Sequence, residues 1–360
     1  MRRAYRQLLW EFVRKESAAL LTIQRSDRPW QLPLAAAVAS GVPVLMGAYL
    51  GLTSAGALGA VAGLSFLYLP ATGLYHGIPV IMACAFGMVS SYALGLASQV
   101  APGMAILLVA CLAAAALLFC KTQAVIPPGP IFMVMAACIG AFSPVDAASA
   151  MQNLGYFVLG CVWACAVAVA YSIYILRHRA PVPPNPPSRH ELYTAIVDSI
   201  MIGGFVGVSL GVAAMLGLEK AYWVPISCLA VMQGVTLRAS WSRHVHRIVG
   251  TVIGMGFTGL LAPLLSNDWG VAIAVTLLTF LIETAVVRNY AFAAIFITPL
   301  TILLAESVAP GAASTALLMQ TRLLDTVIGS LIGLLGAVCL HNPDVRRSIE
   351  RVLAAIRPAP

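Results

Sequence analysis

The amino-acid sequence predicts an all-α, polytopic membrane protein of about 12 transmembrane helices arranged in two six-helix halves. Hydrophobic residues make up 60% of the 360 residues and charged residues only 9%, whereas soluble domains carry about a quarter charged residues. The mean hydropathy is +0.92. Apolar stretches of about 20 residues, the length that crosses a bilayer, recur between prolines, glycines and charged residues.

The expected helices follow these apolar stretches. In the first half we expect helices over about Leu32–Leu50, Ala55–Leu69, Ile78–Ala97, Gly103–Cys120, Pro128–Phe142 and Leu154–Leu176. In the second half we expect them over about Ala195–Leu216, Ala221–Leu237, Ile248–Leu265, Gly270–Val287, Tyr290–Ala305 and Arg322–Leu340.

The same pattern divides the chain into five parts. Residues 1–30 are expected to form a cytoplasmic amphipathic segment, because apolar residues recur there at helical spacing beside a basic face. Residues 31–176 and 191–340 are the two membrane halves, of which the first is expected to be the degenerate repeat. Residues 177–190 form a proline-rich cytoplasmic linker, since its five prolines cannot sustain a helix. Residues 341–360 are a cytoplasmic tail with a second amphipathic pattern after Pro343.

The basic residues predict the orientation. The net charge is +8, and 17 of the 21 lysines and arginines fall in the N-terminal segment, the linker, the loop Arg238–Arg247 and the C-terminal tail. If these segments are cytoplasmic, the positive-inside rule is satisfied and both termini lie in the cytoplasm. Nucleic-acid binding is not expected, because the basic residues are not interleaved with aromatic residues for stacking. The polar first thirty residues lack the features of a cleavable signal peptide.

Several classes of chemistry have no signature in the sequence. The eight cysteines stand singly in apolar stretches, as small packing residues do. His244 and His246 have no further ligand residues beside them, so we expect no metal. There is no phosphate-binding loop, nucleophile elbow, zinc-protease motif or dinucleotide fingerprint. We therefore expect no enzyme activity and no cofactor.

The most informative feature is an eight-residue motif that occurs twice, called here the repeated phrase. Arg247-Ile-Val-Gly-Thr-Val-Ile-Gly254 recurs as Arg322-Leu-Leu-Asp-Thr-Val-Ile-Gly329, with Arg, Thr, Val, Ile and Gly in the same register. An odd number of expected spans separates the two starts, which places them on opposite sides of the membrane. This indicates an inverted three-plus-three repeat, a common architecture of transporters.

Charged residues inside apolar helices are the main site candidates, because each costs about 2.5–3.5 kcal/mol at mid-depth. Arg247, with Thr251 one turn later, is either a snorkelling helix-end cation or a binding group. Arg322 is expected on the outer side, where it can pair with Asp325 along one helix face. A function in substrate or proton movement is the preferred interpretation of that pair.

Glu283 is the other charged residue inside an apolar helix, where burial of its charge costs free energy. Arg288, a further candidate, lies five residues later and is not a good helical neighbour, so the partner of Glu283 is expected on another helix. Glu283 is interpreted either as a proton carrier or as an interhelical hydrogen-bonding group.

Secondary pocket candidates come from breaks in the helices and from one aromatic residue. Pro128, Gly129 and Pro299 interrupt helical hydrogen bonding, which is tolerated at depth where the backbone faces protein or a cavity. Trp223, after Tyr222, is either an interfacial belt residue or a pocket residue. The glycines that follow Arg247 and Arg322 are expected to serve helix packing.

These residues resemble the fusaric acid resistance protein-like (FUSC) family of integral membrane bound transporter domains and aromatic acid exporters. The resemblance covers about Glu191 to Leu340 and rests on four elements in order: Tyr222-Trp223, Arg247/Gly250/Thr251/Gly254, Arg288-Asn-Tyr290 and Arg322/Asp325/Gly329. In the first half, Val80 and Asn153 occupy the places of the two arginines. No soluble domain of the kind found in larger members is present between the halves.

The resemblance implies a bacterial inner-membrane transporter that exports small aromatic or amphipathic organic acids and is driven by protons. The expected partners are therefore an organic anion, protons and the lipid bilayer, and association into a homo-oligomer is left open. The alternative is a non-transporting membrane scaffold or assembly subunit whose glycine-rich helices bind other proteins.

Overall fold

A computed structural model describes Arg14, Leu20 and residues 22–125, 127–143, 146–184, 188–218, 220–261, 267–308 and 315–356. In these parts of the chain the regular secondary structure is entirely helical, so the predicted all-α class is confirmed. The expected amphipathic segment 1–30 falls largely outside the described residues, and residues 22–29 are non-helical.

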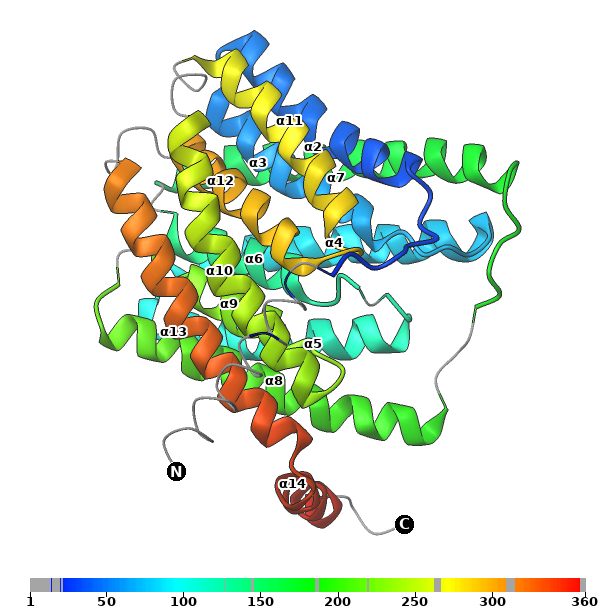
Figure 1. Cartoon of the computed structure of the whole chain (residues 1–360), viewed down its shortest axis with the longest axis vertical. Helices are drawn as coiled ribbons and strands as arrows, with labels where there is room; N and C mark the ends of the chain where they lie inside the picture. The colour runs from blue at the N-terminus through cyan, green and yellow to red at the C-terminus, as the bar shows by residue number, and fades with distance from the viewer. Residues whose placement is uncertain are drawn as a thin grey trace.

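Six α-helices and two 3-10 helices of the described chain occupy the first half of the bundle (Figure 1). They include α2 (Gln31–Leu50), α3 (Thr53–Gly63) with η1 (Leu64–Tyr68), α4 (Leu74–Ser98), α5 (Ala105–Thr122), α6 (Ile131–Phe142) and α7 (Ala147–Leu176). The short 3-10 helix η2 (Pro102–Met104) precedes α5. Each α-helix overlaps one of the helices expected from the sequence.

The second half contains α8 (Arg189–Met215), α9 (Trp223–Met232), α10 (Leu237–Leu261), α11 (Asp268–Ala285), α12 (Tyr290–Val308) and α13 (Thr315–His341). The amphipathic helix α14 (Pro343–Ile356) follows and lies at the edge of the bundle against α8 and α13 (Figure 1). Its first residue is Pro343, as the sequence predicts, because a proline at this position has no hydrogen bond to lose.

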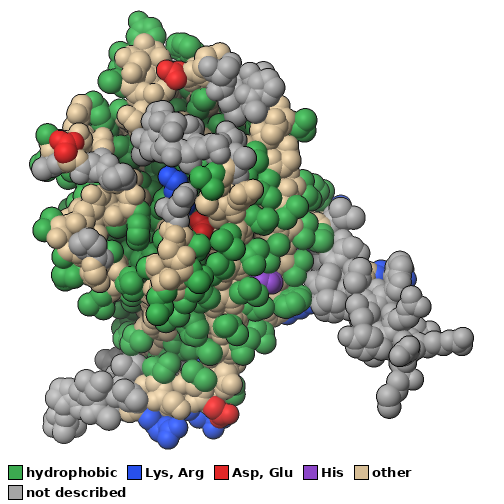
Figure 2. Space-filling view, turned by 90° about the vertical axis from the view of Figure 1, so that its left-hand side faces the viewer, with side chains coloured by type: hydrophobic (Ala, Val, Ile, Leu, Met, Phe, Trp, Pro, Cys, Tyr) green, Lys and Arg blue, Asp and Glu red, His purple; other side chains and the backbone are tan. Residues whose placement is uncertain are grey.

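Seven helices of the described chain, α2, α4, α5, α7, α8, α11 and α13, are long and apolar enough to cross a membrane. Shorter apolar helices cover Thr53–Tyr68, Ile131–Phe142, Trp223–Met232 and Tyr290–Ala305. Side chains such as Phe86, Leu260 and Leu335 are exposed on the outside, and hydrophobic residues dominate the face in Figure 2. A polytopic membrane protein is therefore confirmed, whereas the total of about 12 spans stays a prediction.

The helix contacts repeat with a period of six helices. In the first half α4 packs on α6 and α7, and α3 packs on α7. In the second half α10 packs on α12 and α13, and α9 packs on α13. The contacts between the halves repeat as well, since α5 packs on α8 as α11 packs on α2, and α6 meets α9 as α12 meets α3. The two groups of helices thus share one packing scheme.

Glycines permit the closest of these contacts. A Cβ atom on Gly250 would lie 2.4 Å from the Cβ of Ala294 on α12, and one on Gly329 would lie 2.3 Å from the carbonyl oxygen of Val224 on α9. Gly160 on α7 approaches α3 in the same way. The glycines of the repeated phrase therefore bring helix backbones together, as close packing in membranes requires.

The expected boundaries of two helices were wrong. The predicted basic loop Arg238–Arg247 is the start of α10, and Arg322 lies two turns inside α13 instead of at its first residue. In α10 the residues buried on one face recur at spacings of three and four, including Ser240, His244 and Arg247. This amphipathic period sustains a helix through a segment whose charge had suggested a loop.

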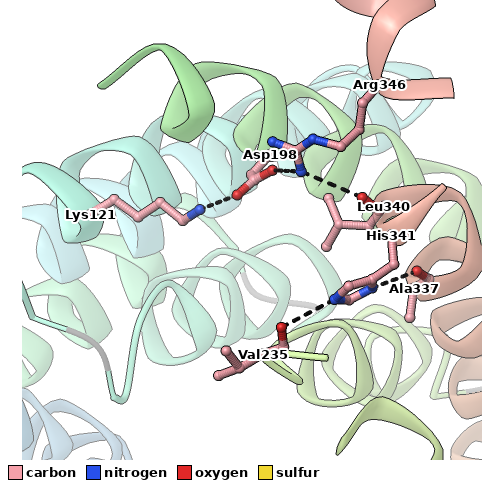
Figure 3. Close-up of polar contacts among 7 residues, drawn as sticks. All are labelled: Lys121, Asp198, Val235, Ala337, Leu340, His341 and Arg346. Atoms are coloured by element: carbon pink, nitrogen blue, oxygen red, sulfur yellow. Dashed lines mark hydrogen bonds and ion pairs between the residues drawn. The ribbon is translucent and has the colours of Figure 1, made fainter. Parts of the chain in front are cut away.

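A polar cluster joins several helices at the end of the bundle where α14 begins (Figure 3). Asp198 on α8 accepts hydrogen bonds from Lys121 at the end of α5 and from Arg346 on α14, the latter over 2.7 Å. The ring of His341 bridges the carbonyl oxygens of Ala337 and Val235. The cluster therefore links α5 of the first half to α8 and α14.

Candidate functional site

A cavity of about 970 Å³ lies between the two halves. The four short helices α3, α6, α9 and α12 all contribute to its wall. Trp223 and Gln233, at the two ends of α9, both line it, and so do Ile131 and Phe142 at the two ends of α6. The cavity thus extends along the whole length of these helices.

The cavity wall carries an excess of positive charge. Among the described residues its charged side chains are five cations and one carboxylate: Arg28, Lys220, Arg243, Arg247, Arg322 and Glu283. All but Arg28 come from the second half. The wall that the first half supplies is uncharged, with serines, Gln152, Asn153 and aromatic residues.

Arg247 is held by two hydrogen bonds at the cavity wall. Its Nη1 donates to the hydroxyl of Tyr290 over 2.9 Å, and its Nη2 donates to Oγ of Ser227 over 3.0 Å. The residue is only 4% exposed. Snorkelling to the headgroups is therefore excluded for this side chain, because it points between α9 and α12 instead of toward the helix end.

Arg322 lies over the ring of Trp223, with 4.2 Å between its guanidinium carbon and the ring centroid. It is 3% exposed, and its Nε and Nη1 have no hydrogen-bond partner in the described structure. The expected ion pair with Asp325 does not form, since both carboxylate oxygens of Asp325 also have no such partner among the described residues. Arg322 therefore keeps hydrogen-bond donors free beside an aromatic ring.

The repeated phrase brings its two arginines to one region. Figure 1 shows α10 and α13 side by side and antiparallel, and these helices are in contact. Arg247 lies about 15 Å along its helix and Arg322 about 10 Å along the other, at 1.5 Å per residue. Because the helices start from opposite ends, both residues reach the interior, where Arg322 is within electrostatic range of Arg247.

Glu283 finds its partner outside the helices. Its Oε2 lies 3.0 Å from Nη2 of Arg28, in the non-helical segment before α2, and its backbone oxygen accepts a hydrogen bond from Nη1 of the same arginine. The Glu283 and Arg28 side chains are 9% and 21% exposed. This ion pair bridges α11 and the N-terminal segment at the cavity wall.

The remaining candidates divide into cavity residues and neighbours. Pro128 lines the cavity, and its carbonyl oxygen accepts a hydrogen bond from Gln233. Gly129 is buried and its carbonyl oxygen accepts from Tyr68. Thr251 and Pro299 are buried but do not line the cavity. Arg288 is exposed in the turn before α12 and also lies outside the cavity wall.

Sequence reasoning missed Arg28, Lys220 and Arg243 as residues of the cavity wall. Arg243 donates to the carbonyl oxygen of Ala230 and lies 5.5 Å from the ring centroid of Tyr290. Its position four residues before Arg247 places both on one side of a helix, a signal that was hidden by the assignment of this stretch to a loop. Arg28 carries no local signal, because its contact with Glu283 spans 255 positions.

The described residues contain no cluster of three or more His, Cys, Asp or Glu side chains that could hold a metal ion. The polar side chains of the described cavity wall are cations, hydroxyls, amides, aromatic rings and one carboxylate. Guanidinium groups with free donors bind carboxylate oxygens, often through two parallel hydrogen bonds.

Comparison with known proteins concerns the same region. Residues 204–336 match the model of the family described as fusaric acid resistance protein-like. The uncharacterized membrane protein YvaC of Bacillus subtilis (strain 168) is 34% identical over 147 residues, which are 39% of this chain and 23% of YvaC. The match thus covers less than a quarter of that relative's length. No solved structure matches the chain.

Residues 204–336, which match the family model, include every charged residue that we describe in the cavity wall except Arg28. The chain is therefore a membrane protein whose residues 204–336 resemble the fusaric acid resistance protein-like family, as its sequence motifs predict.

Proposed function

We propose that this protein transports small organic anions through the cavity between its halves. The observation that carries the proposal is the charge of the cavity, where five cations face one carboxylate along the length of the short helices. A buried cation without a partner is costly, and an anion offsets that cost by supplying the missing charge and acceptors.

The cavity wall favours anions with an apolar body. Trp223, Tyr222, Phe132 and Phe142 line it together with many aliphatic residues. An aromatic carboxylate matches this surface, because its ring packs against the apolar wall while its carboxylate reaches Arg247 or Arg322. Fusaric and hydroxybenzoic acids are therefore the first compounds to test.

Proton coupling and export from the cytoplasm across a bacterial inner membrane complete the proposal. Glu283 supports a proton-dependent step, since protonation of its carboxyl group removes the charge that holds Arg28 at the cavity wall. The family resemblance and the distribution of basic residues support the outward direction and the inner membrane.

The test is flux into proteoliposomes that contain the purified protein. We expect uptake of radiolabelled fusaric or hydroxybenzoic acid above that of protein-free liposomes, with dependence on an imposed pH gradient. Deletion of the gene is expected to increase the sensitivity of the cells to these acids. Absence of flux for the whole panel, together with unchanged sensitivity, contradicts the proposal.

The scaffold alternative makes a different prediction for the same residues. If the glycine-rich helices serve only to bind other proteins, Arg322→Ala and Glu283→Gln change assembly or folding and leave flux unaffected. The charged cavity favours transport, because a scaffold has no need of unpaired arginines facing an internal cavity.

A further inference from the structure

Three arginines of the cavity wall contact the same helix, α9, at successive turns. In order along α9, they are Arg322 over the ring of Trp223, Arg247 at the hydroxyl of Ser227 and Arg243 at the carbonyl oxygen of Ala230. These α9 residues are spaced by four and three positions, so they share one face of the helix. At 1.5 Å per residue, Ser227 lies about 6 Å and Ala230 about 10 Å along the helix axis from Trp223. The arginines thus form a row along the cavity.

The first arginine of this row, Arg322, belongs to a group with Trp223 and Lys220. Its guanidinium carbon lies 4.2 Å from the centroid of the Trp223 ring, and its Nε and Nη1 have no hydrogen-bond partner in the described structure. Lys220 precedes Trp223 by three residues and lines the same cavity. This end of the cavity therefore offers two positive charges beside an indole ring.

The other two arginines, Arg247 and Arg243, belong to a second group around Tyr290. Arg247 donates to the hydroxyl of Tyr290 over 2.9 Å, and the guanidinium carbon of Arg243 lies 5.5 Å from the centroid of the same ring. Arg247 is 4% exposed, and its Nε has no hydrogen-bond partner among the described residues. Tyr290 is the first residue of α12, whereas Trp223 is the first residue of α9, so different helices hold the two groups.

No carboxylate lies within ion-pair distance of these four cations in the described structure. The ion pairs of that structure are Arg28 with Glu283, Lys121 and Arg346 with Asp198, and Arg347 with Asp344. Glu283, the carboxylate of the described cavity wall, is thus already paired with Arg28, the fifth cation of that wall. The two groups therefore present four positive charges without an ion-pair partner.

One bound acid does not compensate this charge, because a monocarboxylate brings one negative charge to four positive ones. Asp325, which is buried three residues after Arg322 and lies outside the described cavity wall, lowers the excess to three when it is ionised. Buried charges without compensation are costly, so a second acid lowers the free energy of the charged cavity further. The charge of the wall thus favours more than one bound anion.

The size of the cavity agrees with two bound acids. Its volume of about 970 Å³ lies at the upper end of the range of about 300–1,000 Å³ for sites that take a drug-sized ligand, and a single-ring acid is smaller than such a ligand. The cavity extends along α9 from Trp223 to Gln233, which is about 15 Å at 1.5 Å per residue. This length leaves room for one acid at each group of cations.

We propose that the cavity contains two anion subsites and binds two acid molecules at the same time. The tryptophan subsite consists of Arg322, Lys220 and Trp223, and the tyrosine subsite consists of Arg247, Arg243 and Tyr290. In each, the carboxylate binds the cations and the ring packs on the aromatic side chain. The inference deepens the proposed anion transport and rests on it. Acids on neighbouring subsites repel each other, so an acid that enters one subsite speeds release from the other, as ions do in multi-site channels.

The first experiment counts the bound acids. Equilibrium binding of labelled hydroxybenzoic acid to the purified protein in detergent is expected to give two acids per wild-type chain. Arg322→Gln and Arg247→Gln should each keep one tight site, because loss of a charge-assisted contact weakens the other subsite at least about ten-fold. Arg177→Gln is the matched control and should bind two acids, since Arg177 is an exposed cation outside the cavity wall.

A second pair of variants covers the case in which the buried arginines are needed for folding. Lys220 and Arg243 are half-buried, so Lys220→Gln and Arg243→Gln disturb the bundle less. Lys220→Gln should weaken only the tryptophan subsite, and Arg243→Gln only the tyrosine subsite. Thermal unfolding in detergent checks that each variant is folded.

The second experiment measures release. Labelled acid should leave the wild-type protein faster after dilution into unlabelled acid than after dilution into buffer, because the unlabelled acid refills the neighbouring subsite. In Arg322→Gln and Arg247→Gln, which keep one tight site each, the two rates should be equal.

Fewer than two bound acids in the wild type would overturn the inference. Complete loss of binding in folded Arg322→Gln and in folded Arg247→Gln would overturn it as well, because both arginines would then hold a single shared acid. Flux into proteoliposomes with one bound acid would support the proposed function and remove the second subsite. Two bound acids without flux would contradict transport and leave the two subsites standing.

Discussion

The two halves of the molecule share a packing scheme and differ in charge. In each half the third and sixth helices pack together and close on the short helices through glycines, such as Gly160 on α7 and Gly329 on α13. Only the second half places arginines beside these glycines, since Val80 and Asn153 stand in their positions in the first. Helix packing in this protein is thus independent of the residues that give the cavity its charge.

The difference between the halves indicates that the charged residues serve the cavity and not the fold. Helix contacts in a membrane depend on small residues and close van der Waals packing, which both halves retain. A guanidinium group inside the bundle carries a cost of burial that the first half avoids. Substitutions that exchange residues between the halves therefore test the comparison directly.

The largest effect is expected when the arginines are replaced by their first-half counterparts. Arg322→Asn and Arg247→Val each remove a charge-assisted interaction worth about 1.5–3 kcal/mol, so the apparent affinity for the anion should fall about 10- to 100-fold. Concentration-dependent uptake in proteoliposomes measures the apparent affinity. Asn153→Ala is the control, since Asn153 lines the same cavity without charge. An equal loss of affinity in that variant would show that the loss does not depend on the charge of the arginines.

A smaller effect, on stability, is expected equally in both halves. Gly329→Ala and Gly160→Ala each place a Cβ atom within 2.7 Å of a neighbouring helix. Overpacking of this kind costs about 1–3 kcal/mol, so both variants should unfold at a lower temperature in detergent. Gly204→Ala, whose added Cβ meets nothing within 4 Å, is the control. Destabilisation of Gly329→Ala alone would show that the halves do not pack alike.

The smallest effect is expected from the aromatic ring beneath Arg322. Aligning α3 to α9 on their contacts with Gly160 and Gly329 places Leu58 opposite Trp223, and both line the cavity. Trp223→Leu removes a cation–π contact worth about 0.5–2 kcal/mol, which corresponds to a two- to thirty-fold loss of anion affinity. Trp223→Phe should recover part of it. If both substitutions leave transport unchanged, the ring of Trp223 does not contribute to anion binding.

Much of the fold follows from local sequence patterns. Each predicted helix overlaps an observed one, because apolar length and breaks at Pro and Gly act within a single segment. The predicted first residues of α10 and α13 were wrong because Arg247 and Arg322 were assigned to helix ends, where charged residues of membrane proteins usually lie. In this protein they lie inside the helices and face a cavity instead of lipid.

The sequence by itself determined the membrane class, the positions of the helices and the identity of the costly residues Arg247, Glu283, Arg322 and Asp325. Only the tertiary structure decided their partners: Arg28 for Glu283, Tyr290 for Arg247 and Trp223 for Arg322. The physical reason is range. Hydrophobicity and helical period act over a few residues, whereas a contact such as Arg28 with Glu283 depends on how all the intervening helices pack.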